Sequence, residues 1–267
     1  MLAFANAKIN LGLNVIEKRP DGYHNLETIF YPVKLYDVIE ITDAVETSCV
    51  IKGVDVPGDA TDNICIKAYQ LLKKDFNLPP QQITLLKNIP VGAGLGGGSS
   101  DAAFLIKLLN QKFELGLTDN QMEVYAGQLG ADCPFFIRNE PVFAEGIGDE
   151  FSAVDLDLSN YFMVLVKPEV HVSTADAYSG IKPIIPSSSV KDLIPLPLKD
   201  WKLNLKNDFE ATVFSKYPEI ERVKTELYHA GAIYAAMSGS GSCVFGIFEE
   251  ETKLSGLEKD NKVFYNV

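Results

Sequence analysis

The stretch Pro90–Ser100, PVGAGLGGGSS, decides the fold of this chain. Five of its residues are glycines, and glycine loses more backbone entropy on folding than any other residue, so a regular core strand or helix would not favour them. Glycine does allow a positive φ and a close approach of the backbone to a ligand. The apolar run AAFLIKLLN follows Ser99, Ser100 and Asp101, and serines are good helix N-caps. The pattern therefore predicts a glycine loop that opens a helix over 99–112.

A glycine loop joined to a helix N-terminus presents backbone N–H groups and the positive end of a dipole to an anion. We therefore predict a phosphate-rich ligand here, ahead of the alternative of a flexible surface loop. The loop is not a Walker A loop, because no Lys-Ser or Lys-Thr follows the glycines. Gly92, Gly94 and Gly97 match the dinucleotide pattern, but the nearest acid about 20 residues on, Glu114, lies at a predicted helix end. A dinucleotide-dependent oxidoreductase remains an alternative.

Composition limits the class of partner. The 267 residues suffice for one large domain or two of ordinary size. A net charge of −12 argues against nucleic acid or an anionic membrane as a partner, and an anionic substrate then requires a local basic site. Four scattered cysteines and three histidines predict neither a disulfide framework nor a zinc site, and reduced cysteines indicate a cytoplasmic protein. We expect no signal peptide and no membrane span.

Two charged side chains lie in positions that suggest chemistry. Alternating apolar and polar residues predict a strand over 3–16, in which Lys8 and Asn10 share one face that is either solvated or directed into a site. Asp132 follows a helix that stops at Gly130, and it is either a helix cap or a buried acid with a catalytic task. Residues 28–41 are predicted to form either one strand or a bent strand pair broken at Pro32, and further strands are predicted over 47–53, 82–87 and 161–168. The proline- and serine-rich stretch 181–199 is predicted to be a loop.

Several stretches, in order along nearly the whole chain, resemble the GHMP kinase superfamily. They are AKINLGLNV (7–15), RPDGYHNLETIF (19–30), IPVGAGLGGGSSDAA (89–103), LGADCPFF (129–136), AEGIGDE (144–150) and MSGSGSCVF (237–245). The glycine loop alone indicates only the superfamily, whereas the second and fourth stretches are similar to members that act on a cytidine diphosphate-linked methylerythritol. The resemblance implies an α+β, two-lobed GHMP kinase fold. Its N-terminal ATP-binding lobe, with the glycine-rich phosphate loop, would span 1–155, and a ferredoxin-like C-terminal lobe would span 156–267.

The resemblance also implies an activity. It predicts a small-molecule kinase that uses ATP with Mg²⁺ to phosphorylate the 2-hydroxyl of that substrate in the non-mevalonate route to isoprenoid precursors. Lys8 and Asp132 match the catalytic pair of the family. Asp132 would accept the proton of the attacking hydroxyl, and Lys8 would hold that carboxylate ionised and offset charge on the transferring phosphoryl group. The protein ligands of the metal are left open.

The remaining site residues are carried over position by position from the resemblance. The residues implied around the ATP phosphates are Pro90, Val91, Gly92, Ala93, Gly94, Leu95, Gly96, Gly97, Gly98, Ser99 and Ser100, with Asn63, Ile64 and Lys87 near the adenine. The substrate residues are Asn10 for the erythritol, Tyr23 and His24 for the polar edge of cytosine, Thr174 and Tyr178 for the cytidine, and Gly239 and Ser240 in a second glycine–serine loop. Asp101 stands where the family often has asparagine.

Two further rivals remain at this point. Another GHMP kinase, for mevalonate or homoserine, would not need the cytidine pocket that Tyr23, His24 and Tyr178 suggest. A non-catalytic nucleotide-binding protein of the same fold would not need to retain both Lys8 and Asp132.

Overall fold

The computed structural model describes residues 1–59 and 62–267, and it mixes helices with sheet as the α+β prediction requires. Its strands are β1 (Leu2–Lys18), β2 (His24–Asp43), β3 (Ser48–Gly53), β4 (Gln81–Lys87), β5 (Val142–Glu145), β6 (Glu150–Ala153), β7 (Phe162–Pro168), β8 (Tyr234–Met237), β9 (Val244–Phe248) and β10 (Asn261–Tyr265). Its helices are α1 (Ile64–Asp75), α2 (Gly97–Lys112), α3 (Asp119–Gly127), α4 (Phe135–Arg138), α5 (Thr174–Tyr178), α6 (Val190–Leu193), α7 (Leu198–Asn204), α8 (Phe209–Lys216) and α9 (Pro218–His229). Within the described ranges, no helix has the length and apolar character needed to cross a membrane.

These elements form two compact units whose segments alternate along the chain. The first unit comprises Met1–Ala7, Leu35–Val91 and Gly96–Glu140, and the second comprises Lys8–Lys34, Gly92–Leu95 and Pro141–Val267. The long strands β1 and β2 contribute residues to both units. The division into lobes over 1–155 and 156–267 stays a prediction.

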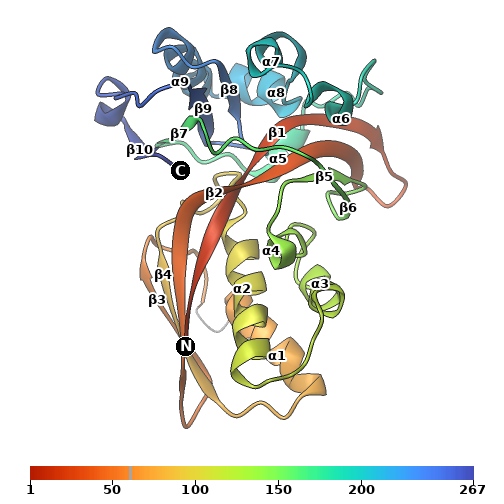
Figure 1. Ribbon diagram of the computed structural model, residues 1–267, viewed down its shortest axis with the longest axis vertical. Helices are drawn as coiled ribbons and strands as arrows, with labels where there is room; N and C mark the ends of the chain where they lie inside the picture. Colours follow the sequence, from red (N-terminus) through yellow and green to blue (C-terminus); the bar gives the residue numbers. More distant parts are fainter. Residues whose placement is uncertain (60–61) are drawn as a thin grey trace. The chain divides into compact units, whose positions relative to one another are not determined.

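In the first unit, α1 and α2 lie side by side on one face of the sheet that contains β2, β3 and β4 (Figure 1). Strand β3 pairs in parallel with β4, and β4 pairs antiparallel with β2. Because side chains alternate along a strand, Gln81, Ile83, Leu85 and Lys87 of β4 are all buried on one face. The same alternation that builds the core thus buries a lysine at the end of the strand that leads into the glycine loop.

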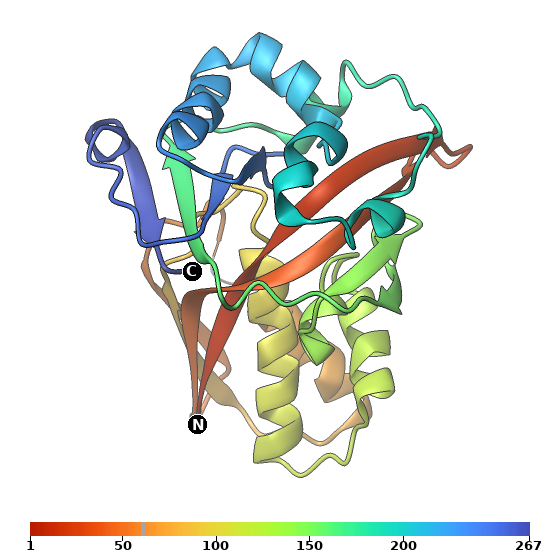
Figure 2. The same ribbon diagram turned by 45° about the horizontal axis from the view of Figure 1, so that its top comes forward.

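In the second unit, an antiparallel sheet has the strand order β10-β7-β9-β8 (Figure 2, where the green strand β7 lies between the blue strands β9 and β10). The connection from β7 to β8 contains the helices α5 to α9. The final connection contains only a 3-10 turn, Leu257–Lys259. The order is 4-1-3-2 in chain order, which supports the predicted ferredoxin-like arrangement. Its core includes Val164, Val166, Ile220, Leu227 and Phe248.

The structure decides one open alternative and corrects two local predictions. Strand β2 continues through Pro32, because the segment around this proline pairs with neither β4 nor β5, so its missing N–H costs no bond to those strands. Helix α6 interrupts the predicted loop 181–199, since Ser189 caps it and Val190 is buried. Helix α2 begins at Gly97 rather than at residue 99, because its N-cap is Gly96 in a left-handed conformation and not a serine.

Candidate active site

The first glycine loop has the backbone conformation that its composition predicts. Gly92, Gly94 and Gly96 have φ values of +62°, +78° and +69°. Residues with a Cβ rarely adopt this region. Gly96 ends the loop as the N-cap of α2 and makes no side-chain cap bond, so the first N–H groups of this 16-residue helix are left for another acceptor. The loop therefore fits a phosphate group on the side of the helix N-terminus.

Within the second unit, the two glycine loops touch. The Ser238 hydroxyl donates to the Gly94 carbonyl oxygen over 2.8 Å, and the Cys243 N–H donates to the Ala93 carbonyl oxygen over 3.2 Å. A Cβ atom on Gly94 would lie 2.0 Å from the Ser238 carbonyl oxygen. The loops come from distant parts of the chain, and glycine is required where they meet.

Lys8 and Asn10 point into the protein and not into solvent. Both lie on β1 and are buried, with 4% and 3% of their surface exposed. The Lys8 ammonium group donates to Asn10 Oδ1 over 2.7 Å and lies 4.4 Å from the centroid of the Phe30 ring. Asn10 Nδ2 in turn donates to Thr28 Oγ1 over 3.1 Å. This network orients the lysine, and neither Thr28 nor Phe30 carried a signal in the sequence that pointed to such a role.

Asp132 lies in the first unit, in the turn between α3 and α4, and it is half-buried. The N-cap of α4 is Pro134, so Asp132 does not occupy that position, which was one of its two predicted roles. The other role, that of an acid with a catalytic task, stays a prediction, as does its pairing with Lys8 of the second unit.

Three aromatic side chains of the second unit form a continuous stack. The His24 and Tyr178 rings are stacked with centroids 4.7 Å apart and an interplanar angle of 25°. Tyr178 also meets Phe209 edge-on, with centroids 4.7 Å apart. Burial lowers the pKa of His24, and the charge of Lys18 adds to this, so the imidazole is neutral near pH 7. A neutral imidazole has one donor and one acceptor, which can form hydrogen bonds with the polar edge of a nucleobase.

The other predicted cytidine residues flank this stack in the chain. Tyr23 is 62% exposed, and Thr174 is the exposed first residue of α5, which Ser173 caps. Phe209 was not among the predicted site residues, because its place beside Tyr178 depends on how α5 and α8 pack.

The second glycine–serine loop, Ser238–Ser242, is held at several points. The Ser238 N–H donates to the Cys243 carbonyl oxygen, the Gly241 N–H to the Ser238 carbonyl oxygen, and the Ser242 hydroxyl to Val170. Gly239 and Gly241 have φ values of +53° and +84°. Among residues 1–59 and 62–267, the N–H groups of Gly239, Ser240 and Ser242 have no hydrogen-bond acceptor. The loop therefore presents backbone donors of the kind that bind an anion.

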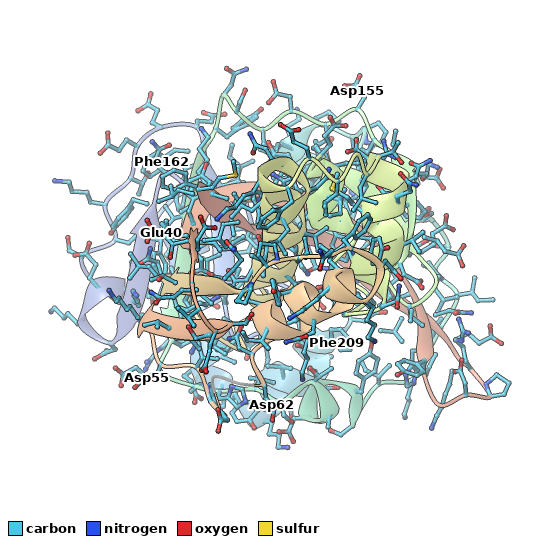
Figure 3. All side chains as sticks on the ribbon, turned by 90° about the horizontal axis from the view of Figure 1, so that it is seen from below. Glu40, Asp55, Asp62, Asp155, Phe162 and Phe209 are labelled. Carbon is cyan, nitrogen blue, oxygen red and sulfur yellow. The ribbon has the colours of Figure 1, made fainter. Side chains whose placement is uncertain are left out.

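The predicted adenine residues have structural roles as well. Asn63 is the N-cap of α1 and accepts the Cys65 N–H over 2.9 Å, so Ile64 begins the helix (Asp62, just before it, is labelled in Figure 3). Lys87 forms ion pairs with Asp37 and, over 2.7 Å, with Asp101. Its contact with ATP stays a prediction, because its ammonium group is already held by the carboxyl groups of Asp37 and Asp101.

The group Asp37–Lys87–Asp101 is buried, with 0%, 3% and 2% of each residue exposed. Asp37 also accepts the N–H groups of Asn88 and Ile89. Burial raises the pKa of Asp101 to about 8 against the opposing effect of Lys87, and Asp37 raises it further. Burial lowers the pKa of Lys87, but the two carboxylates outweigh this and raise it. The Asp101 carboxyl group therefore binds a proton at a higher pH than an ordinary carboxyl group does.

We expect Asp101→Asn to change how stability depends on pH. In the wild type, the folded state keeps a proton on Asp101 that the unfolded chain has lost, so the free energy of unfolding falls as pH rises from about 4 to about 8. Asparagine removes this effect. The stability of the variant relative to the wild type should increase with pH, by at most about 1.4 kcal/mol per unit. Urea unfolding from pH 5 to 9 measures this, with Asp119→Asn on the exposed start of α3 as the control. A difference that stays constant with pH would contradict the assignment.

Two family models match parts of this chain. The model of the GHMP kinases N terminal domain matches residues 63–140, and that of the GHMP kinases C terminal domain matches residues 196–261. The chain is similar to proteins named 4-diphosphocytidyl-2-C-methyl-D-erythritol kinase. One from Bacteroides fragilis is 57% identical, over 97% of this chain and 96% of that protein. One from Porphyromonas gingivalis is 44% identical, over 95% and 94%.

The fold is similar to solved structures of the same kind. A crystal structure of 4-(cytidine 5'-diphospho)-2C-methyl-D-erythritol kinase superposes with a TM-score of 0.85 at 29% identity, covering 99% of this chain and 98% of the other. A mevalonate kinase superposes with a TM-score of 0.72 at 16% identity, covering 99% and 98%, and this likeness concerns the fold alone.

Proposed function

This chain belongs to the GHMP kinase family, and we propose that it transfers the γ-phosphoryl group of ATP to the 2-hydroxyl of 4-diphosphocytidyl-2-C-methyl-D-erythritol. The observation that carries the proposal is that one unit contains both the contact between the two glycine loops, at Gly94 and Ser238, and the stacked pair His24–Tyr178. The loops suit the phosphate groups of donor and substrate, and the aromatic pair suits a nucleobase. Relatives over nearly the full length carry the name of this kinase.

The residues divide the task as phosphoryl transfer requires, which is mainly positioning and stabilisation of charge. The N–H groups around Gly96 bind ATP phosphates, and Mg²⁺ accompanies the nucleotide and neutralises phosphate charge when bound. Lys8, oriented by Asn10, stabilises negative charge on the transferring group. Asp132 accepts the proton of the substrate hydroxyl. In such sites, phosphates and water supply most Mg²⁺ ligands, so a cage of protein carboxylates is not needed.

A direct assay tests the proposal. The purified chain is incubated with ATP, Mg²⁺ and the cytidine substrate, and ADP release is measured together with the ³¹P NMR signal of a new phosphate monoester. We expect turnover with this substrate and at least 100-fold lower kcat/KM with mevalonate or homoserine. Equal turnover of mevalonate would point to another GHMP kinase. Binding of NADH without any kinase activity would favour the oxidoreductase alternative.

Tyr178→Ala should raise the KM for the cytidine substrate about 10-fold and leave the KM for ATP within about twofold, because stacking of one base on an aromatic ring contributes about 1–3 kcal/mol. His24 covers one face of the ring at 4.7 Å, so a base that stacks on Tyr178 takes the opposite face or displaces His24. Steady-state kinetics with each substrate varied measures the effect. Tyr178→Phe keeps the ring and is the control. Equal changes in both KM values would place Tyr178 outside the cytidine pocket.

A further inference from the structure

The segment Asn207-Asp208-Phe209-Glu210, between α7 and the first turn of α8, is attached to three parts of the second unit. Its backbone follows β1: the Leu13 N–H donates to the Lys206 carbonyl oxygen over 2.8 Å, and the Asp208 N–H donates to the Leu13 carbonyl oxygen over 2.9 Å. The Asp208 carboxylate accepts the Val15 N–H over 2.8 Å. These bonds fix the segment to the strand that carries Lys8 and Asn10.

Asn207 uses its whole carboxamide group to hold the second glycine–serine loop. Its Nδ2 group donates to the carbonyl oxygens of Met237 and Gly239, each over 2.8 Å. Its Oδ1 atom accepts the Phe209 N–H over 3.0 Å. Because two partners are acceptors and the third is a donor, only one orientation of the amide satisfies all of them. The residue is buried, with 3% of its surface exposed.

The two hydrogen bonds from Asn207 Nδ2 to Met237 and Gly239 hold the loop where it meets the other site residues. Glu210 accepts the Met237 N–H over 2.9 Å, so both polar groups of the Met237 backbone are bonded by this one segment. The Asn10 N–H donates to the Ser238 hydroxyl oxygen, and a Cβ atom on Gly239 would lie 3.2 Å from Asn10 Oδ1. A loop that moved away from Asn207 would lose its contact with Asn10.

The segment also reaches the aromatic stack. Phe209, labelled in Figure 3, meets Tyr178 edge-on, and Tyr178 stacks on His24. The same four residues therefore contact the predicted cytidine pocket on one side and the glycine–serine loop on the other.

We propose that Asn207 is a positioning residue for phosphoryl transfer, which sets the place of the Ser238–Ser242 loop relative to Asn10 and the bound phosphates. This inference rests on the proposed kinase activity. Asn207 does not touch substrate; it acts through the carbonyl groups of Met237 and Gly239. Because misplacement of a positioning group by about 1 Å can lower the rate about 100-fold, its loss should affect kcat more than binding.

The test compares three variants with the wild type in steady-state kinetics, thermal unfolding and binding of a non-hydrolysable ATP analogue. Asn207→Ala removes both donors, and we expect kcat to fall about 30- to 100-fold while both KM values change less than about fivefold. The control is Asn204→Ala, which removes another asparagine side chain at the exposed end of α7 and should leave kcat unchanged.

Asn207→Asp gives a kcat whose pH dependence distinguishes a positioning role of Asn207 from a purely structural one. Its ionised carboxylate repels two carbonyl oxygens, whereas its protonated form can donate one hydrogen bond. Its kcat relative to that of Asn207→Ala should therefore rise as pH is lowered from 8 to 6. The chain neighbours Lys206 and Asp208 and the Glu210–Lys224 ion pair are present in both variants, so their titration cancels in this ratio.

The outcomes separate the inference from the proposed function. A wild type without kinase activity would overturn the proposed function. An active wild type with Asn207→Ala within threefold of its kcat, even with a lower melting temperature, would overturn the positioning role alone. A ratio of Asn207→Asp to Asn207→Ala that does not change with pH would also overturn it.

Discussion

Asp132→Asn should lower kcat by about 1000-fold and leave the affinity for ATP within about threefold of the wild type. Asparagine has the size and shape of aspartate, but it cannot accept the proton of the attacking hydroxyl, and general base catalysis contributes about 10²- to 10⁴-fold. Binding of ATP relies on other groups, chiefly the backbone around Gly96. Steady-state kinetics gives kcat, and calorimetry with a non-hydrolysable ATP analogue gives the affinity.

The matched control for this prediction is Glu114→Gln, which neutralises an exposed acid of the same unit just after α2. We expect it to behave like the wild type. If Asp132→Asn retains more than about a tenth of wild-type turnover, Asp132 is not the general base. If it loses ATP affinity to the same extent as turnover, its role is in binding the nucleotide or its metal.

Gly96→Val should weaken binding of ATP by about 100-fold or more. Gly96 has φ +69° and is the N-cap of α2, and a β-branched residue there is strained by about 1–3 kcal/mol. The chain relieves this strain when the loop and the first turn of α2 rearrange, and the N–H groups that bind phosphate are then displaced. Calorimetry with the ATP analogue measures the loss, and circular dichroism shows whether the variant is folded.

Gly256→Val is the control for this second prediction. Gly256 has an ordinary φ of −67°, and a Cβ atom there would have no heavy atom within 4 Å. The same substitution should therefore leave ATP binding unchanged. A folded Gly96→Val protein with wild-type ATP affinity would show that the loop does not bind the phosphates, while Gly96→Ala should give an intermediate loss.

Local chemistry in the sequence was sufficient to predict the elements. The alternation over 3–16 predicted β1, and the apolar run after Ser100 predicted most of α2. These predictions succeed because backbone preferences and side-chain periodicity act within a few residues. The choice between one strand and a bent pair at Pro32 stayed open, since whether the missing N–H of this proline matters depends on the neighbouring strand.

The partners of the charged side chains were harder to predict from the sequence. Lys8 lies within β1 and Lys87 at the end of β4, and both were expected at the site. The structure buries Lys87 between Asp37 and Asp101, 50 and 14 residues away along the chain, whereas Lys8 donates to Asn10 two residues away. Asp37 lies in the segment LYDVIEI, which contains a second acid, Glu40, and the sequence did not show which of the two is buried or what its partner is.

By itself, the sequence determined the long helices and strands, the glycine loop that opens α2, and the family, because all of these depend on residue types at short, fixed spacings. Only the tertiary structure decided that the two glycine loops touch, that His24 stacks on Tyr178, and that Asn207 holds the second loop. Those contacts join residues that are far apart in the chain. Hydrogen bonds and stacking reach only a few ångströms, so they form once packing of the core has brought the segments together.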